Sequence, residues 1–149
     1  MLAYLADADR GHGRFLATTI DAMTGSTVDR LYVHAKIGVV DDGWLTIGSA
    51  NLNAHSFFND TEVNVHVSDA ALARGTRLRL WSEHLDLPDD EIAGDPTDVI
   101  DRLWIPIARR ERERQRTGQR REHRLRELGP SSRKIERLLG PMDAIVVDG

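Results

Sequence analysis

The clearest pattern of apolar and polar positions begins at residue 31. From Leu31 to Val39, apolar residues occupy every second position, which is the period of a β-strand. The polar run 41–43 (Asp-Asp-Gly) then predicts a tight turn, and residues 44–47 predict the strand that returns from it as a hairpin. Residues 61–67 alternate again and predict a third strand.

The pattern differs on either side of these strands. Residues 15–23 fit either a strand or a short helix. Beyond the third strand the spacing becomes helical, and Ser68 or Asp69 is the expected cap of a helix that runs to about Leu87. A second, short helix is expected to begin at Asp98.

Composition limits the class of protein. A chain of 149 residues, 40% of them hydrophobic, is long enough for one ordinary domain. The absence of cysteine excludes a disulfide framework, a thiolate metal site and a cysteine nucleophile. The sequence contains neither a signal-peptide pattern nor an apolar run long enough to span a bilayer, so we expect a cytoplasmic or peripheral membrane protein.

Charge is divided unevenly along the chain. Residues 1–108 carry 8 basic and 17 acidic side chains, whereas residues 109–137 carry 12 basic and 5 acidic ones. The arginine-rich segment has no interleaved aromatic residues to stack on bases, so nucleic acid is not the expected partner. We expect this segment to form a solvated helix or a disordered arm; lipid head groups or a partner domain are its expected contacts if it has a function.

Six residues that suit phosphate chemistry follow one another at fixed intervals: His34, Lys36, Asp41, Gly48, Ser49 and Asn51. His34 and Lys36 are two residues apart on a predicted strand, so both side chains should project from the same face. A partly neutral imidazole can attack phosphorus, and an ammonium group beside it can hold the phosphate oxygens. Hydrogen-bond donors from Ser49 and Asn51 can stabilise the same oxygens.

This spacing resembles the signature of the phospholipase D superfamily, His-x-Lys-x4-Asp-x6-Gly-Ser-x-Asn. The resemblance implies that His34 is the catalytic histidine and that Lys36, Ser49 and Asn51 bind phosphate. It also implies catalytic contributions from Lys36, from Glu62, which would orient His34, and from Asp41, whose expected role is to support the loop geometry. The resemblance implies no metal ion or other cofactor.

Members of this superfamily act with two such motifs, and this chain carries one. The second histidine would come either from a homodimer mate or from sequence absent here. Because few residues precede the motif, we expect the chain to resemble the C-terminal half of a bacterial phospholipase D or cardiolipin synthase-like protein. His34 would then be either the nucleophile or the general acid.

The expected fold is α/β, with a mixed sheet flanked by helices, an incomplete domain and a helical C-terminal extension. We expect a partial catalytic domain over 1–87, a connector with a short helix over 88–108, and a basic, partly disordered extension over 109–149. The expected function is hydrolysis or transfer of the phosphatidyl group of phospholipids through a phosphohistidine, with peripheral membrane contact. The alternatives are a homodimeric, metal-independent nuclease of the same superfamily and a catalytically inactive interaction module.

Overall fold

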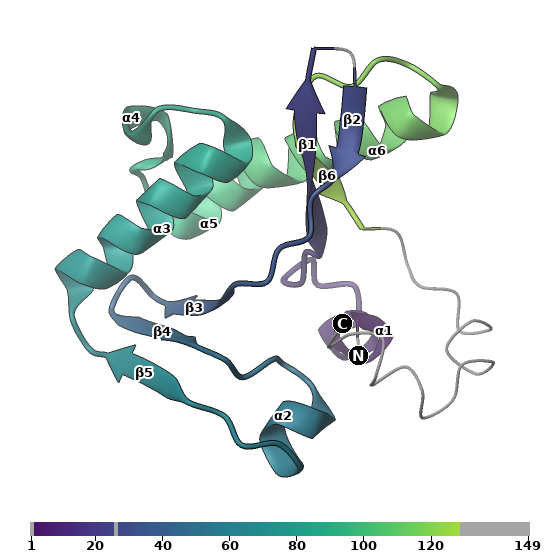
Figure 1. Cartoon of the computed structure of the whole chain (residues 1–149). Coiled ribbons are helices and arrows are strands. Elements are labelled where there is room, and N and C mark those ends of the chain that lie inside the picture. Colours follow the sequence, from purple (N-terminus) through teal and green to yellow (C-terminus); the bar gives the residue numbers. More distant parts are fainter. Residues whose placement is uncertain (1, 26, 129–149) are drawn as a thin grey trace.

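The computed structural model describes residues 2–25 and 27–128, which form two three-stranded sheets with helices packed against them (Figure 1). All strand pairs in both sheets are antiparallel. The predicted α/β class is confirmed, with the strands divided between two small sheets.

The first sheet carries the motif. Its strands are β3 (Lys36–Val40), β4 (Trp44–Gly48) and β5 (Asn64–Val67), in the order β3-β4-β5. The predicted hairpin is confirmed: Lys36 lies opposite Gly48, and Val40 lies opposite Trp44. The first strand is shorter than predicted: β3 begins at Lys36, opposite Gly48, and the N–H of Ala50 beyond β4 bonds to the side-chain oxygen of Asn64 at 3.1 Å.

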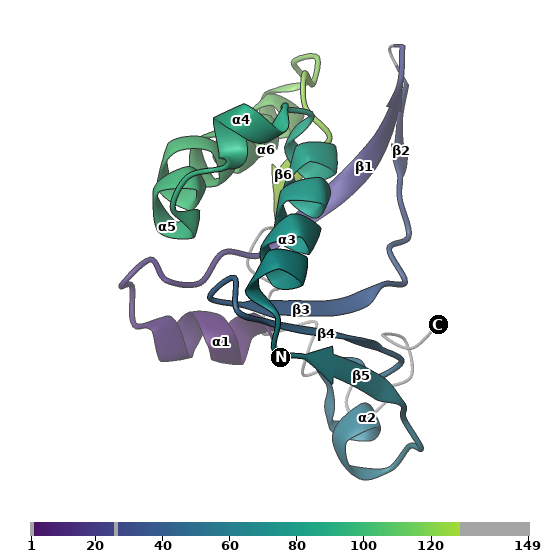
Figure 2. The same ribbon diagram turned by 90° about the vertical axis from the view of Figure 1, so that its left-hand side faces the viewer.

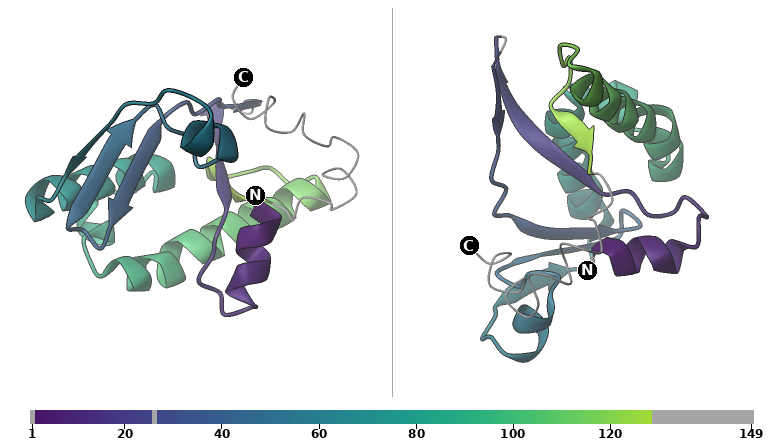
Figure 3. Two further views of the ribbon diagram at one scale, coloured as in Figure 1. Left: turned by 90° about the horizontal axis from the view of Figure 1, so that it is seen from below. Right: turned by 90° about the vertical axis from the view of Figure 1, so that its right-hand side faces the viewer.

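The second sheet is formed by β1 (Thr18–Thr24), β2 (Thr27–Arg30) and β6 (Leu125–Glu127), in the order β2-β1-β6. The segment 15–23, which fitted either a strand or a short helix, thus contributes to strand β1. Strand β6 lies between β1 and α6 (Ile105–Thr117), the helix that comes before β6 in the chain (Figure 3). This sheet therefore joins segments about a hundred residues apart in the sequence.

Helices make up most of the remaining structure. Their bounds are α1 (Leu2–Asp9), α2 (Ala54–Phe58), α3 (Ala70–Leu85), α4 (Asp89–Ile92), α5 (Pro96–Val99), a π-helical turn (Ile100–Trp104) and α6 (Ile105–Thr117). Within the described ranges, none of them combines the length and apolar content needed to cross a bilayer.

One of the two predicted helix starts is confirmed. Asp69 caps α3, and its side chain accepts a hydrogen bond from the backbone N–H of Leu72 at 3.0 Å. The start predicted at Asp98 is wrong, since Asp95 caps α5 and accepts from the N–H of Thr97 at 2.8 Å. Pro96 explains the earlier start, because its fixed φ favours the first position of a helix.

The hydrophobic core lies between α3, α6 and the second sheet (Figure 2). Trp81 and Trp104 pack against it with their rings edge to face, 5.5 Å between centroids. These two tryptophans thus have a packing role. The fully or nearly buried members are Leu78, Leu85, Ile92, Val99, Ile107, Ala108 and Leu125.

As far as the structure describes it, the first part of the arginine-rich segment is helical, in α6, with most of its arginines exposed, and the segment is also attached to the folded unit. Glu111 is fully buried on α6, and Arg121 is 7% exposed. Arg121 donates to the carboxylates of Asp21 and Glu111, so the segment is tied to β1 by buried ion pairs. Residues 129–149 of the predicted extension lie outside the described residues.

A partly buried ion pair attaches the motif hairpin to α3. Arg77, 4% exposed, donates to both carboxylate oxygens of Asp42, from Nε at 2.6 Å and from Nη2 at 2.7 Å. The guanidinium also lies 4.6 Å over the ring of Trp81 and donates to the carbonyl of Ile92 at 3.3 Å. The hydrogen bond from Arg77 lowers the pKa of Asp42, so this carboxylate stays charged.

Replacing Arg77 by methionine should destabilise the fold, because Asp42 would keep its charge without its partner. We expect Arg77→Met to lower the free energy of unfolding by about 3 kcal/mol in urea denaturation. Arg79→Met, at an exposed position of the same helix, is the matched control and should change it by less than about 0.5 kcal/mol. Equal effects of the two substitutions would contradict the structural role of the pair.

Stability should also depend on the protonation of His84. Burial lowers the pKa of His84 below its usual value of 6.5, with Arg124 acting in the same direction and Glu83 opposing it. The unfolded chain then binds this proton more tightly, so the free energy of unfolding should fall as the pH drops below about 6.5. Between pH 7.5 and pH 5, the melting temperature of His84→Gln should fall by less than that of the wild type. An equal fall in both proteins would contradict this role of His84.

Candidate active site

Two motif residues lie at the open end of the β3–β4 hairpin. Lys36 begins β3, directly opposite Gly48, which ends β4. His34 lies two residues earlier, in an irregular, exposed segment, where its ring stacks on that of Tyr32 with 5.7 Å between centroids. The ammonium of Lys36 donates to the carbonyl of His34 at 3.1 Å, which holds the two residues together.

A groove of about 550 Å³ opens on the Lys36 side of this sheet. Lys36, Thr46, Asn51 and Asn64 are among its polar residues, so the structure brings together Lys36 and Asn51, two of the predicted phosphate ligands. Apolar side chains form another part of the wall, among them Trp44, Leu52 and Phe57. The groove therefore offers a cation and amides beside an apolar surface.

Ser49 is held in a tight arrangement with the segment that leads into β5. Its hydroxyl donates to the carboxylate of Glu62 and accepts from the backbone N–H of Val63 at 3.0 Å. Hydrogen bonds from Ser49 and Ser56, together with the charge of Lys36, lower the pKa of Glu62, so its carboxylate is ionised. In the described part of the chain, Glu62 bonds to Ser49 and not to the ring of His34, so its orienting role stays a prediction.

The loop that carries Asn51 is fixed by a neighbouring helix cap. Asn53 caps α2 by accepting from the N–H of Ser56 at 2.8 Å, and the hydroxyl of Ser56 accepts from the N–H of Asn51 at 3.1 Å. Ser56 also reaches Glu62. Sequence reasoning missed Ser56, although the Asn-x-x-Ser spacing of a helix start was present to indicate it.

Asn64 was also missed. Its side-chain oxygen accepts from the N–H of Ala50 at 3.1 Å, next to the predicted ligands Ser49 and Asn51. An asparagine in an alternating strand carries no signal that distinguishes it from any other polar position on that face.

Asp41 lies away from the other motif residues, at the closed end of the hairpin. Asp41 and Asp42 have φ values of 48° and 51°, and the N–H of Gly43 bonds to the carbonyl of Val40 at 2.9 Å. Aspartate tolerates this left-handed backbone better than most residues. This geometry agrees with a turn-forming role for Asp41, and its catalytic contribution stays a prediction.

Within residues 2–25 and 27–128, no group of three or more histidine, aspartate and glutamate side chains is placed to hold a metal ion.

Comparison with known proteins places this geometry in a family. A model described as "Cardiolipin synthase, PLD-like domain" matches residues 10–81, the stretch that contains the whole motif. The chain is 40% identical to phospholipase D alpha 1 of Spuriopimpinella brachycarpa over an alignment that covers 42% of the chain and 9% of that protein. It is 33% identical to phospholipase D B of Dictyostelium discoideum, over 55% of the chain and 8% of that protein.

The family model and these relatives support the phospholipase D superfamily as the family of this chain. The resemblance carried by the motif is thereby confirmed. A third phospholipase D, zeta 1 of Arabidopsis thaliana, is 39% identical over 42% of the chain and 7% of its own length. The chain thus spans less than a tenth of the length of these phospholipases D.

Gly48 allows β5 to approach β4 at the site. A Cβ at this position would lie 2.0 Å from the side-chain oxygen of Asn64 and 2.4 Å from the carbonyl of Val63. We expect Gly48→Ala to lower the free energy of unfolding by about 2 kcal/mol, measured by urea denaturation. Gly43→Ala is the control, since its Cβ would meet nothing closer than 3.7 Å; a Gly48→Ala variant as stable as this control would contradict the close approach.

Proposed function

We propose that this chain supplies one half of a phospholipase D-type active site and acts on phosphodiesters. The observation that carries the proposal is the shared groove, which Lys36 and Asn51 line from separate segments, while the ammonium of Lys36 donates to the backbone carbonyl of His34. A cation and amide donors at one place suit the non-bridging oxygens of a phosphodiester, because phosphoryl transfer depends chiefly on positioning and charge stabilisation.

The reaction requires two histidines, of which His34 is one. A ring nitrogen of the first histidine bonds to phosphorus as the bond from phosphorus to the leaving alcohol oxygen breaks, and the second histidine gives that oxygen its proton. Water or a second alcohol then attacks the phosphohistidine, passes its proton to the second histidine, and the nitrogen–phosphorus bond breaks. Water gives hydrolysis, and an alcohol gives phosphatidyl transfer.

The second histidine comes from another polypeptide segment, either a second copy of this chain or further sequence with its own motif. The open end of the hairpin supports this view, because His34 is exposed and accessible to a facing group. His34 serves as nucleophile or as general acid according to which motif it faces.

Phospholipids are the substrate class that we propose. Leu52 and Phe57 extend the groove with apolar surface next to its polar groups, which suits a phosphodiester that carries acyl chains. The names of the relatives, all phospholipases D, favour the same class. Substrate in a bilayer implies peripheral contact of the protein with the membrane surface.

Choline release from phosphatidylcholine vesicles tests the proposal, and ethanol in the reaction reports transfer through formation of phosphatidylethanol. We expect His34→Ala to abolish both products and Lys36→Ala to lower the rate by about a hundredfold, because a positioned charge that stabilises the transition state is lost. His12→Ala, at an exposed histidine near α1, should leave the rate unchanged.

Three outcomes separate the alternatives. Activity that survives His34→Ala contradicts the proposal. Cleavage of DNA without metal ions, with no choline release, supports the nuclease. A wild-type chain that neither turns over nor binds a short-chain phosphatidylcholine supports the inactive interaction module.

A further inference from the structure

A second groove, of about 620 Å³, lies on the sheet formed by β1, β2 and β6. It shares no lining residue with the groove beside Lys36. Its walls come from the β1–β2 hairpin, the end of α6 and the segment between α6 and β6. The charged side chains that line it are Asp21, Asp29, Arg30, Arg120, Arg121 and Arg126. Four guanidinium groups thus face two carboxylates, in a chain whose net charge is −4.

Arg121 and Asp21 form the fixed part of this lining. Each side chain is nearly buried, 6% and 5% exposed, and they are joined by an ion pair. Arg121 also donates to Glu111 and to the carbonyls of His123 and Arg124, at 2.8 and 3.1 Å for the carbonyls. These contacts hold the α6–β6 segment rigidly against β1.

The other arginines leave donors available to a ligand. Arg30 and Arg120 are exposed, and neither makes an ion pair with any described residue. The Nε of Arg126 is buried 3.6 Å from the carboxylate of Asp21, and this ion pair holds the side chain in the lining of the groove.

We propose that this groove binds a phosphate group, with Arg30, Arg120 and Arg126 as its ligands. Guanidinium groups bind phosphate oxygens through paired, charge-assisted hydrogen bonds, and three of them suit a doubly charged phosphate better than a single carboxylate. The lining contains no aromatic side chain, so it offers bases no surface on which to stack and does not suit single-stranded nucleic acid.

The phosphate can belong to a soluble compound or to a lipid head group. Calorimetric titration with inorganic pyrophosphate tests the first source, and co-sedimentation with phosphatidylcholine vesicles containing phosphatidic acid tests the second. Binding of either probe by the wild type is the expected result, and the probe that binds identifies the source.

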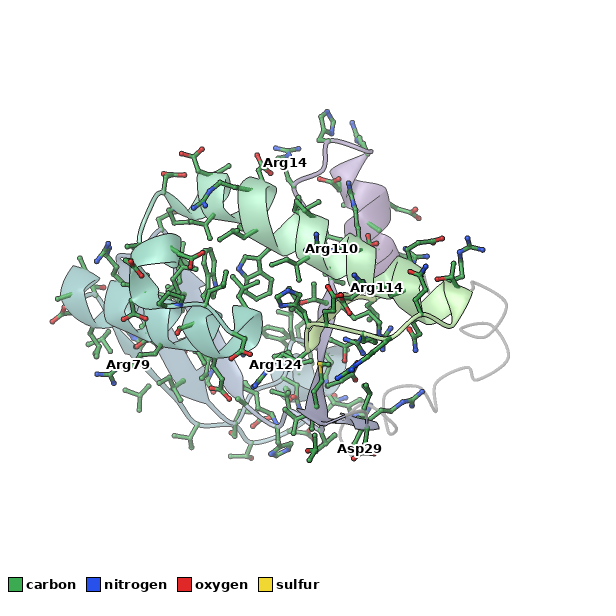
Figure 4. The ribbon with its side chains drawn as sticks, turned by 90° about the horizontal axis from the view of Figure 1, so that it is seen from above. Arg14, Asp29, Arg79, Arg110, Arg114 and Arg124 are labelled. Carbon is green, nitrogen blue, oxygen red and sulfur yellow. The ribbon has the colours of Figure 1, made fainter. Side chains whose placement is uncertain are left out.

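Substitutions that remove positive or negative charge from the groove test whether the probe binds there. Arg30→Gln combined with Arg120→Gln should weaken binding by about tenfold or more, because two charged donors are lost. Asp29→Asn should strengthen binding, because it removes a negative charge from the same groove. Arg79→Gln removes one positive charge from α3, well away from Asp29, and should change binding by less than about twofold (Figure 4).

Each result decides the proposal. Loss of binding in the double variant with retention in Arg79→Gln supports it, provided that circular dichroism shows equal folding. Failure of the wild type to bind either probe overturns it, as does equal weakening by all arginine substitutions or binding that rises with the length of a DNA oligonucleotide. Choline release is not part of this test, so the groove and the proposed catalytic function can fail separately.

Discussion

The ion pair between Arg77 and Asp42 is the constraint on which the position of the motif depends. It joins the turn of the β3–β4 hairpin to the helix that follows the sheet, and Trp81 and the carbonyl of Ile92 hold the same guanidinium. The β3–β4 hairpin is thus attached to α3 at its turn, while Lys36 and Gly48 lie at its opposite, open end. His34, beyond this open end, is left exposed.

Local signals in the sequence predicted the elements that depend on local physics. The alternation after Leu31 and the polar turn predicted the hairpin, and Asp69 predicted the start of α3. Pairing between distant segments left no such signal. Strand β6 joins β1 only because Leu125 fills the core and Arg121 reaches Asp21, and neither contact can be read from a short window of sequence.

The same distinction applies to the site. The spacing of the motif indicated that Lys36 and Asn51 act together, and the groove brings them together. Residue spacing could not indicate that Glu62 would bond to Ser49, because the partner of a carboxylate is set by how two loops meet. Nor could it show that Asp41 lies at the far end of the hairpin until the strand register was known.

The family match ends at residue 81, whereas the buried core does not. Ile92, Val99, Ile107 and Leu125, all in the interior, lie beyond that boundary, and Leu85 lies just past it. A fragment expressed from the matched residues alone would keep every signature position yet lack most of its own apolar interior. Fragment boundaries chosen by homology would therefore separate the strands of the motif from the scaffold that supports them.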